Sequence, residues 1–377
     1  MTKGKVYIEG SVCFLNYDLS FGGTEKVIVS LANYLSAQKR KVTILLLSNK
    51  NDFKDFLSPE VEIISLDISK IKYFIFYFAI FIRKQKFNNF ISNVWPLTSL
   101  SFLVRALSPK TKLIYVEHCN LTEQFRERSY FFKICQNLSI KYLYKFAHSV
   151  VTVSAGLKDD LIKKGVLSSK ITTIYNPVIC VPPDEQTEIK IGNSDLIDKW
   201  LTHSGKKIIA VGEFKPQKNF INLVNAFSLL RKKIDIDASL LILGDGQEMN
   251  EIRNAIKSQD LDKHIFLPGW VKDPLPYFKF GDIFALSSNY EGFGVVIVEA
   301  LSQGLNVVST DCKSGPSEIL KDGEFGFLCP TQDSLAFAES MEKALKNPLP
   351  EAKLLQRSFD FTEEKIGKLY EEILLNS

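Results

Sequence analysis

The stretch NYEGFGVVIVEALSQG, at 289–304, has a glutamate at each end of an apolar run and two glycines just after the first glutamate. Such glycines leave the backbone N–H groups at the start of the following helix open to an anion. Carboxylates such as Glu291 and Glu299 accept hydrogen bonds from sugar hydroxyls, and an acidic residue beside a nucleotide ribose is a recurring arrangement. The stretch therefore indicates a nucleotide-sugar site; the alternative is a glycine-capped helix with incidental glutamates.

A second stretch, VGEFKPQKNF at 211–220, places cations where a helix is expected to begin. A strand-like run ends at Gly212, and the helical pattern starts near Asn219, so Lys215 and Lys218 lie in the loop at the helix N-terminus. The helix dipole favours anions at this end and disfavours cations. A bound phosphate group would explain the two lysines. Solvated loop lysines are the alternative.

Short apolar runs rich in β-branched residues alternate with helical patterns along the chain. Continuous apolar strands that alternate with helices predict parallel sheets covered on both faces, hence an α/β fold. Expected strands are 5–10, 41–48, 61–66, 88–93, 112–118, 149–154, 170–175, 206–212, 239–246, 264–269, 282–288 and 306–311.

The strand pattern stops at a polar, proline-containing stretch and restarts near residue 206. We therefore expect two Rossmann-like, doubly wound domains that face a cleft, since such folds bind ligands at the carboxyl ends of their strands. The predicted parts are an acceptor-binding domain at 1–180, a linker at 181–205, a donor-binding domain at 206–355, and a helix at 356–377 that crosses back to the first domain.

Charge is divided unevenly between the two halves. Residues 1–180 hold 25 of the 47 Lys and Arg but 13 of the 43 Asp and Glu, so the first half is strongly basic and the remainder is acidic. This asymmetry suggests that the first domain faces an anionic surface or substrate. Chance variation in lysine content is the alternative.

An aromatic run at 73–82 is the longest apolar stretch, and basic residues flank it. As a helix its ten residues rise only about 15 Å, too little to cross a membrane. The segment 70–86 is expected either to lie in a membrane interface or to pack in the core. The flanking cations are Lys70, Lys72, Arg83, Lys84 and Lys86.

Cysteine usage and the N-terminus predict a cytoplasmic protein. No cleavable signal pattern precedes the first strand-like run. The cysteines are scattered without a CxxC pair, so they are expected to be reduced and mostly buried. They are Cys13, Cys119, Cys135, Cys180, Cys312 and Cys329.

The segment from SNYEGFGVVIVEALSQG through EFGFLCP closely resembles the donor-domain signature of the retaining GT-B glycosyltransferases of family 4, also called glycosyl transferases group 1. The resemblance continues through VGEFKPQKNF, LLILGDGQE and FLPGWVKDPLPYF. It is fainter in FGGTEKVIVSLANYL and YVEHCN. In all it covers nearly the whole chain.

The resemblance implies roles for matching positions. Glu291 would contact the transferred sugar, and Glu299 the ribose. Lys218 would bind the diphosphate, with His118 near the reacting carbon, although a histidine at a strand end is more often structural. Donor-binding positions are Gly22, Gly23, Gly212, Lys215, Lys218, Val271, Glu291, Phe293, Gly294, Val295 and Glu299; those taken as catalytic are His118, Glu291 and Lys218.

One position departs from the family pattern. The family has Gly-Arg-Leu where this chain has Gly212-Glu213-Phe214, so the arginine that helps to neutralise the diphosphate is absent. A carboxylate facing a diphosphate would repel it. Either Glu213 turns away or Lys215 supplies the missing charge.

The expected activity is transfer of a hexosyl or N-acetylhexosaminyl group from a UDP- or GDP-sugar, with retention of configuration and without metal or cofactor. The expected acceptor is a saccharide or a polyprenyl-diphosphate-linked saccharide of bacterial surface-polysaccharide synthesis (O-antigen, capsule or lipopolysaccharide). The protein would be cytoplasmic or peripheral on the inner membrane face, with no nucleic-acid partner. A nucleotide-sugar 2-epimerase and a non-catalytic nucleotide-sugar-binding protein remain as alternatives.

Two other classes of site are disfavoured. Asp235-Ile-Asp237 resembles a D-x-D metal motif, but it lies in a charged connection between a helix and a strand. The four histidines show no metal-ligand spacing, and no G-x-G-x-x-G follows a strand.

Overall fold

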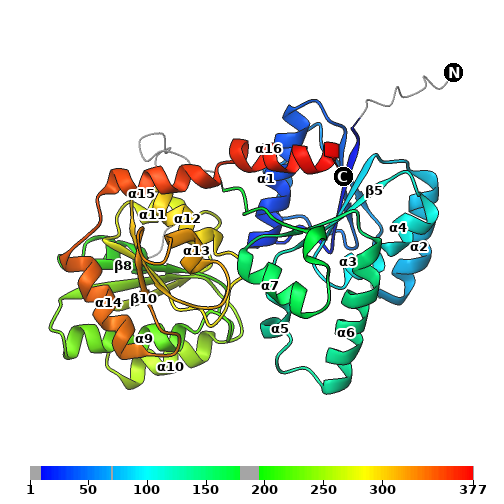
Figure 1. Ribbon diagram of the computed structural model, residues 1–377. Helices are drawn as coiled ribbons and strands as arrows, with labels where there is room; N and C mark the ends of the chain where they lie inside the picture. Colours follow the sequence, from blue (N-terminus) through cyan, green and yellow to red (C-terminus); the bar gives the residue numbers. More distant parts are fainter. Residues whose placement is uncertain (1–9, 69–70, 179–194, 377) are drawn as a thin grey trace. The chain divides into compact units, whose positions relative to one another are not determined.

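The computed structural model describes residues 10–68, 71–178 and 195–376, which fall into two compact units (Figure 1). Unit 1 comprises Met1–Val178 with Thr362–Ser377, and unit 2 comprises Ile179–Phe361. In each unit the strands pair in parallel, and helices join one strand to the next. The predicted fold class, two doubly wound parallel sheets, is confirmed.

Unit 1 contains a seven-stranded sheet of order β3-β2-β1-β4-β5-β6-β7. The order reverses direction at β1, which marks the doubly wound topology. Its strands are β1 (Val12–Asn16), β2 (Val42–Leu46), β3 (Glu62–Ser65), β4 (Asn89–Asn93), β5 (Lys112–Glu117), β6 (Ser149–Thr152) and β7 (Ile171–Thr173).

Helices cover both faces of this sheet. One layer shares a hydrophobic cluster with the strands and comprises α2 (Ile71–Lys84), α3 (Leu97–Leu100), α4 (Phe102–Leu107), α6 (Tyr130–Leu143) and α7 (Ala155–Lys163). Right-handed crossovers place α1 (Gly23–Ala37) on the other face. There α1 packs against α16 (Glu363–Asn376), through hydrogen bonds from Ser30 to Glu363 and from Tyr34 to Glu371. The short α5 (Leu121–Gln124) follows β5.

Unit 2 contains a six-stranded sheet of order β10-β9-β8-β11-β12-β13. Its strands are β8 (Lys206–Val211), β9 (Ala238–Leu243), β10 (Ile265–Gly269), β11 (Ile283–Leu286), β12 (Asn306–Thr310) and β13 (Phe327–Cys329). Its helices are α8 (Asp195–Leu201), α9 (Phe220–Lys232), α10 (Met249–Ser258), α11 (Leu275–Phe278), α12 (Val295–Ser302), α13 (Pro316–Leu320), α14 (Ser334–Lys346) and α15 (Glu351–Ser358).

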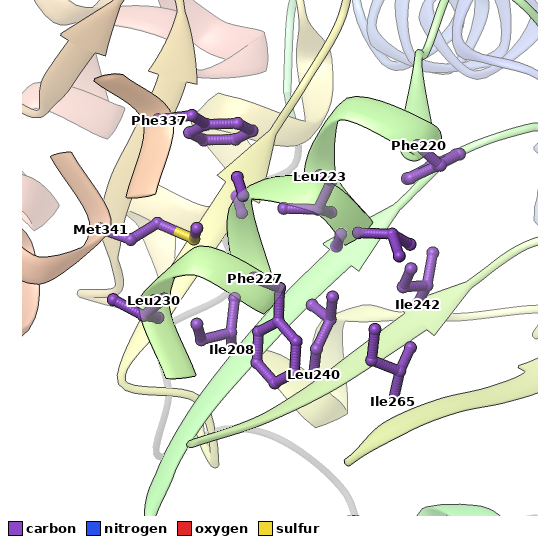
Figure 2. Packing of buried hydrophobic residues seen from close by; sticks show 14 of the residues in the cluster. Ile208, Phe220, Leu223, Phe227, Leu230, Leu240, Ile242, Ile265, Phe337 and Met341 are labelled. Carbon is purple, nitrogen blue, oxygen red and sulfur yellow. The ribbon is translucent and has the colours of Figure 1, made fainter. Parts of the chain in front are cut away.

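The core of unit 2 lies between α9 and the strands beneath it (Figure 2). Leu223, Phe227 and Leu230 recur at helical spacing on α9, and each is fully buried. They meet Ile208 of β8 and Leu240 of β9, which are neighbouring strands of the sheet. This packing fixes where α9 begins, and hence where the loop carrying Lys218 lies.

Three features differ from the sequence prediction. The first described strand is β1, at 12–16, whereas the expected strand at 5–10 lies almost wholly outside the described residues. The short β13 was not expected. The range predicted as a linker, 181–205, contains α8, whose Trp200 is completely buried.

The aromatic segment at 70–86 has two sides. Phe74 and Phe78 of α2 are fully buried in the core, whereas Tyr73 and Phe76 are half or more exposed. The helix therefore packs in the core and also presents an aromatic outer side. Within the described residues no helix is long and apolar enough to cross a membrane. Lys70 and the Lys72 side chain lie outside what is described.

The described cysteines are free thiols, and three of them are buried. These three are Cys13, Cys312 and Cys329; Cys119 is half-buried and Cys135 exposed. Cys180 falls outside the described residues.

Candidate active site

The candidate site of unit 2 is built at the carboxyl ends of two neighbouring strands. β8 and β11 pair directly. Ile208 lies opposite Ile283, which comes 75 residues later in the sequence. The loop after β8 leads to α9, and the loop after β11 leads to α12. The sheet order therefore brings the lysine loop and the glutamate loop together.

The ammonium group of Lys218 lies 2.6 Å from Glu291 Oε1. Both side chains are largely buried, with 16% and 7% of their surface exposed. Ser288 donates a second hydrogen bond to the same carboxylate oxygen, at 2.6 Å. The two residues that the sequence singled out separately thus form one buried ion pair.

Polar residues that the sequence analysis did not single out hold the two loops in place. Asn289 donates to the Pro216 carbonyl at 2.9 Å, and Gln217 donates to the Tyr290 carbonyl at 2.9 Å. Ser287 donates to the Lys218 carbonyl at 2.7 Å. The sequence feature that could have identified them is the run of hydroxyl and amide residues at 287–289, directly after β11.

The glycines of EGFG shape the start of α12. Gly294 caps the helix with φ of 99°, a left-handed conformation that favours glycine. The first N–H groups of α12, including that of Val295, have no carbonyl partner within the helix. Glu299 lies in the middle of α12 and is buried. The Phe293 ring packs inward, 5.4 Å from the Phe361 ring centroid.

The residue that replaces the family arginine forms a surface ion pair. Glu213 Oε2 lies 2.8 Å from Lys215 Nζ, and the two side chains are 65% and 37% exposed. Lys215 therefore neutralises Glu213 rather than adding a free cation beside Lys218. Among the described residues of these loops, Lys218 is the buried cation.

Two other candidate positions lie at the same edge of the sheet. Gly212 directly follows β8, and the stem of Lys218 packs over it, 3.4 Å from where a Cβ would lie. Val271 follows β10 and is half-buried.

In unit 1, three candidate residues lie at the carboxyl edge of the sheet. Gly22 caps α1 after β1, and Gly23 is the first residue of that helix; both are exposed. His118 follows β5. Asn93 ends β4, which lies between these two strands, and it donates to the Leu15 carbonyl at 3.1 Å.

His118 is buried and neutral. Desolvation lowers its pKa to about 3, and its Nε2 lies 3.1 Å from Asn93 Oδ1. Because the amide nitrogen of Asn93 already donates to a carbonyl, its oxygen accepts, so the network assigns the proton to Nε2 of His118. Nδ1 is then an acceptor, and it has no hydrogen-bond partner among the described residues.

The neighbouring Glu117 lies in a buried polar network. Tyr144 and Thr98 donate to its carboxylate, the latter at 2.9 Å, and the Trp95 backbone N–H donates at 3.3 Å. Burial raises the pKa of Glu117 to about 7, although these hydrogen bonds oppose the shift. The network fixes the strand end that carries His118.

Asp235 and Asp237 do not approach the candidate site. Asp237 pairs with Arg231 at 2.9 Å just before β9 begins, at the opposite end of the strands from α12. Within the described ranges, no three His, Cys, Asp or Glu side chains lie close enough together to hold a metal ion.

Two family profiles match the chain. The profile described as Glycosyl transferases group 1 matches residues 195–359, and the profile Glycosyltransferase Family 4 matches residues 21–180. Together with the two doubly wound sheets, they define a GT-B glycosyltransferase. The chain belongs to glycosyltransferase family 4, and it is an enzyme of the transferase class.

Curated relatives span almost the whole chain. One, from Campylobacter jejuni, is N-acetylgalactosamine-N,N'-diacetylbacillosaminyl-diphospho-undecaprenol 4-alpha-N-acetylgalactosaminyltransferase, 28% identical over 350 residues that cover 90% of each protein. Another is the amylovoran biosynthesis glycosyltransferase AmsD of Erwinia amylovora, 26% identical over 94% of this chain and 96% of that protein.

Solved structures share the fold. Anabaena HepE in complex with UDP superposes with a TM-score of 0.78, at 18% identity over 97% of this chain and 100% of that one. Sucrose-phosphate synthase from Thermosynechococcus elongatus superposes with a TM-score of 0.80, at 18% identity over 98% and 100%.

Proposed function

We propose that the protein transfers a sugar from a UDP- or GDP-sugar to a polyprenyl-diphosphate-linked saccharide in bacterial surface-polysaccharide synthesis, at the cytoplasmic side of the membrane. The observation that carries the donor half is the buried Lys218–Glu291 pair beside the start of α12. The acceptor half is supported by the lipid-linked acceptor named for the Campylobacter relative and by the polysaccharide named for the Erwinia relative.

Departure of a nucleoside diphosphate needs positive charge at the leaving group. Lys218 would supply it by exchanging part of its contact with Glu291 for the diphosphate, with the amides at Gly294 and Val295 as further donors. Each such donor lowers the barrier by about 3 kcal/mol. Glu291, once released, would accept from a hydroxyl of the transferred sugar, and Glu299 would hold the ribose. This route requires no metal ion.

We infer that the anomeric configuration is retained through an oxocarbenium-like ion pair on the leaving-group face. A neutral His118 would take part in this step through Nδ1, a buried acceptor without a partner among the described residues, when a sugar or acceptor hydroxyl displaces the atoms that cover it. At neutral pH it would not act as a cation, because burial lowers its pKa to about 3. Its role would be positioning.

The donor half is tested by thermal unfolding with UDP, GDP, ADP, CMP and their sugar conjugates, on wild type and Glu299→Ala. A ligand at 100 times its Kd adds about 2.7 kcal/mol of stability. Stabilisation by one base, much reduced in the variant, supports the proposal. The absence of any shift would contradict it. Product analysis with and without acceptor separates transfer from 2-epimerisation, which needs no acceptor.

The proposed location at the membrane is tested on the basic residues that lie in and beside α2. Replacement of Lys72, Arg83, Lys84 and Lys86 by Gln should weaken binding to anionic liposomes, since each basic residue near such a surface contributes about 1 kcal/mol. Unchanged binding to the liposomes would show that these basic residues of the α2 segment do not bind the membrane.

A further inference from the structure

Three aromatic rings meet beyond the carboxyl edge of the unit 1 sheet, and we call them the aromatic cluster. Trp95 follows β4, Phe125 follows α5, and Phe132 is the third residue of α6. The ring centroid of Trp95 lies 5.3 Å from that of Phe125 and 5.5 Å from that of Phe132. The two phenylalanine centroids lie 5.3 Å apart. Each ring thus contacts the other two at the distances that favour aromatic pairs.

The aromatic cluster borders the part of unit 1 where a doubly wound sheet binds ligands. The strand order of this sheet reverses between β1 and β4, so the loops after these two strands flank the switch point. The loop after β1 carries Gly22, and the loop after β4 carries Trp95. The topology alone therefore predicts a ligand beside Trp95.

Two hydrogen bonds tie the Trp95 loop to the strand end that carries His118. Asn93 Oδ1 lies 3.1 Å from His118 Nε2. The backbone N–H of Trp95 donates to the carboxylate of Glu117 at 3.3 Å. Between them Val94 has φ of 59°, a conformation that a β-branched residue adopts only where its surroundings impose it. Trp95 is therefore held at a fixed place close to His118.

The Trp95 side chain offers carbon, and no unpaired hydrogen-bonding atom, to a ligand. Its indole N–H donates to the Ser139 hydroxyl at 2.9 Å, which also fixes the direction of the ring. Trp95 and Phe125 pack against the core on one side, yet both remain half-buried. Phe132 is half-buried as well, and the Arg128 guanidinium lies 5.8 Å from its ring centroid. Such a surface suits a ligand that presents C–H groups.

We propose that the aromatic cluster is a sugar-binding surface on which a pyranose ring of the acceptor saccharide stacks. A pyranose presents C–H groups on one face and hydroxyls around its rim, so it needs aromatic carbon beneath it and polar atoms beside it. Nδ1 of His118, an acceptor without a partner among the described residues, is such a polar atom. The inference rests on the proposed function, in which the acceptor is a saccharide, and it assigns the recognition of that saccharide to Trp95, Phe125 and Phe132.

The test is binding of four methyl glycosides to the full chain, measured by saturation-transfer NMR. The probes are the methyl glycosides of glucose, galactose, N-acetylglucosamine and N-acetylgalactosamine. Ligands this small are expected to bind weakly, with a Kd of about 1 mM. At least one of them should bind the wild type, with saturation strongest at the C–H protons of one ring face. One-sided saturation reports stacking, which a cluster with only a structural role would not produce.

Substitutions assign the sugar to the rings. Trp95→Leu removes the indole and should raise the Kd about tenfold, whereas Trp95→Phe keeps a ring and should raise it less than about threefold. Phe125→Leu should also weaken binding, and it decides the matter if thermal unfolding shows that Trp95→Leu does not fold. Phe146→Leu is the matched control and should bind like the wild type. Phe146 is 38% exposed and lies 6.1 Å from the Phe102 ring, but it precedes β6, at the amino edge of the sheet.

Three results would overturn the proposal. The first is equal glycoside binding by the wild type, Trp95→Leu and Phe125→Leu, or no binding of any of the four glycosides to the wild type. The second is loss of glycoside binding in Glu299→Ala but not in Trp95→Leu, which would place the sugar in the candidate donor site. The third is loss of nucleotide-induced stabilisation in Trp95→Leu, which would show that the ring holds the base of the donor.

Nucleotide-induced stabilisation of the wild type separates this inference from the proposed function. If glycoside binding fails while a nucleotide still stabilises the wild type and sugar transfer is detected, the aromatic cluster is not the acceptor site and the proposed function stands. If no nucleotide stabilises the wild type, the proposed function fails even where a glycoside binds to the aromatic cluster.

Discussion

Lys218→Met should destabilise the protein by leaving the buried carboxylate of Glu291 without its cation. Breaking a buried ion pair costs about 3–5 kcal/mol. Because Lys218 keeps 16% of its surface exposed, we expect the lower end, about 3 kcal/mol. This corresponds to roughly 6–12 °C in Tm for a domain of this size. Urea and thermal unfolding measure the loss.

The double variant Lys218→Met/Glu291→Gln separates structure from binding. The introduced glutamine side chain is neutral and can still accept from Ser288, so the loss should shrink to about 1.5 kcal/mol or less. Neither variant should gain stability from the nucleoside diphosphate that stabilises the wild type. Lys215→Met is the matched control, because its exposed pair with Glu213 should contribute under about 1 kcal/mol.

Two results would refute this reasoning. A double variant as unstable as Lys218→Met would show that the unpaired carboxylate is not the cause. Full nucleotide-induced stabilisation of Lys218→Met would remove Lys218 from the diphosphate site, whatever its effect on folding.

Three further predictions concern other parts of the chain. Gly23→Ala should change the free energy of unfolding by less than about 1 kcal/mol, since no described atom lies within 4 Å of the added Cβ. It should nevertheless lower the affinity for the nucleotide-sugar in titrations. Unchanged affinity would exclude this loop from the site. Glu117 has a pKa raised from 4.5 to about 7 by burial. Its contribution to folding stability is therefore full below pH 4.5 and is lost as the pH rises to 7. The stability of wild type relative to Glu117→Gln should therefore fall by about 3 kcal/mol over that window in urea titrations, and a constant difference would contradict the shift. Arg357→Met, which removes donors to the Glu318 and Ile319 carbonyls, should cost about 2–4 kcal/mol in urea unfolding, and a loss below about 1 kcal/mol would contradict this.

Much of the fold follows from the sequence because buried parallel strands need continuous apolar runs. Most expected strands are present close to their predicted positions. β13 was missed because three residues between glycine and proline carry too little periodicity to detect. β1 was missed because its run, VCFLN, has one β-branched residue, and the more typical KVYIEG lies just before it.

The candidate site was predictable as two motifs but not as one arrangement. Residue types placed Lys218 and Glu291 separately, each beside the start of a helix. Their pairing depends on β8 and β11 being neighbours in the sheet. Neither motif contains information about that strand order. The pairing of Glu213 with Lys215 likewise depends on side-chain direction, which the sequence does not specify.

The return of the chain to unit 1 has a consequence for synthesis. The chain leaves this unit after Val178 and re-enters at Thr362, and these two residues form a parallel bridge. Unit 2 is thus inserted into unit 1, and the α16 partner of α1 leaves the ribosome only after all of unit 2. Unit 1 is therefore begun before unit 2 but completed after it, with the α16-binding side of α1 uncovered until unit 2 has been synthesised. Since bridged residues lie about 5 Å apart, a short glycine linker from 178 to 362 would remove the insertion and let unit 1 be made as one continuous chain.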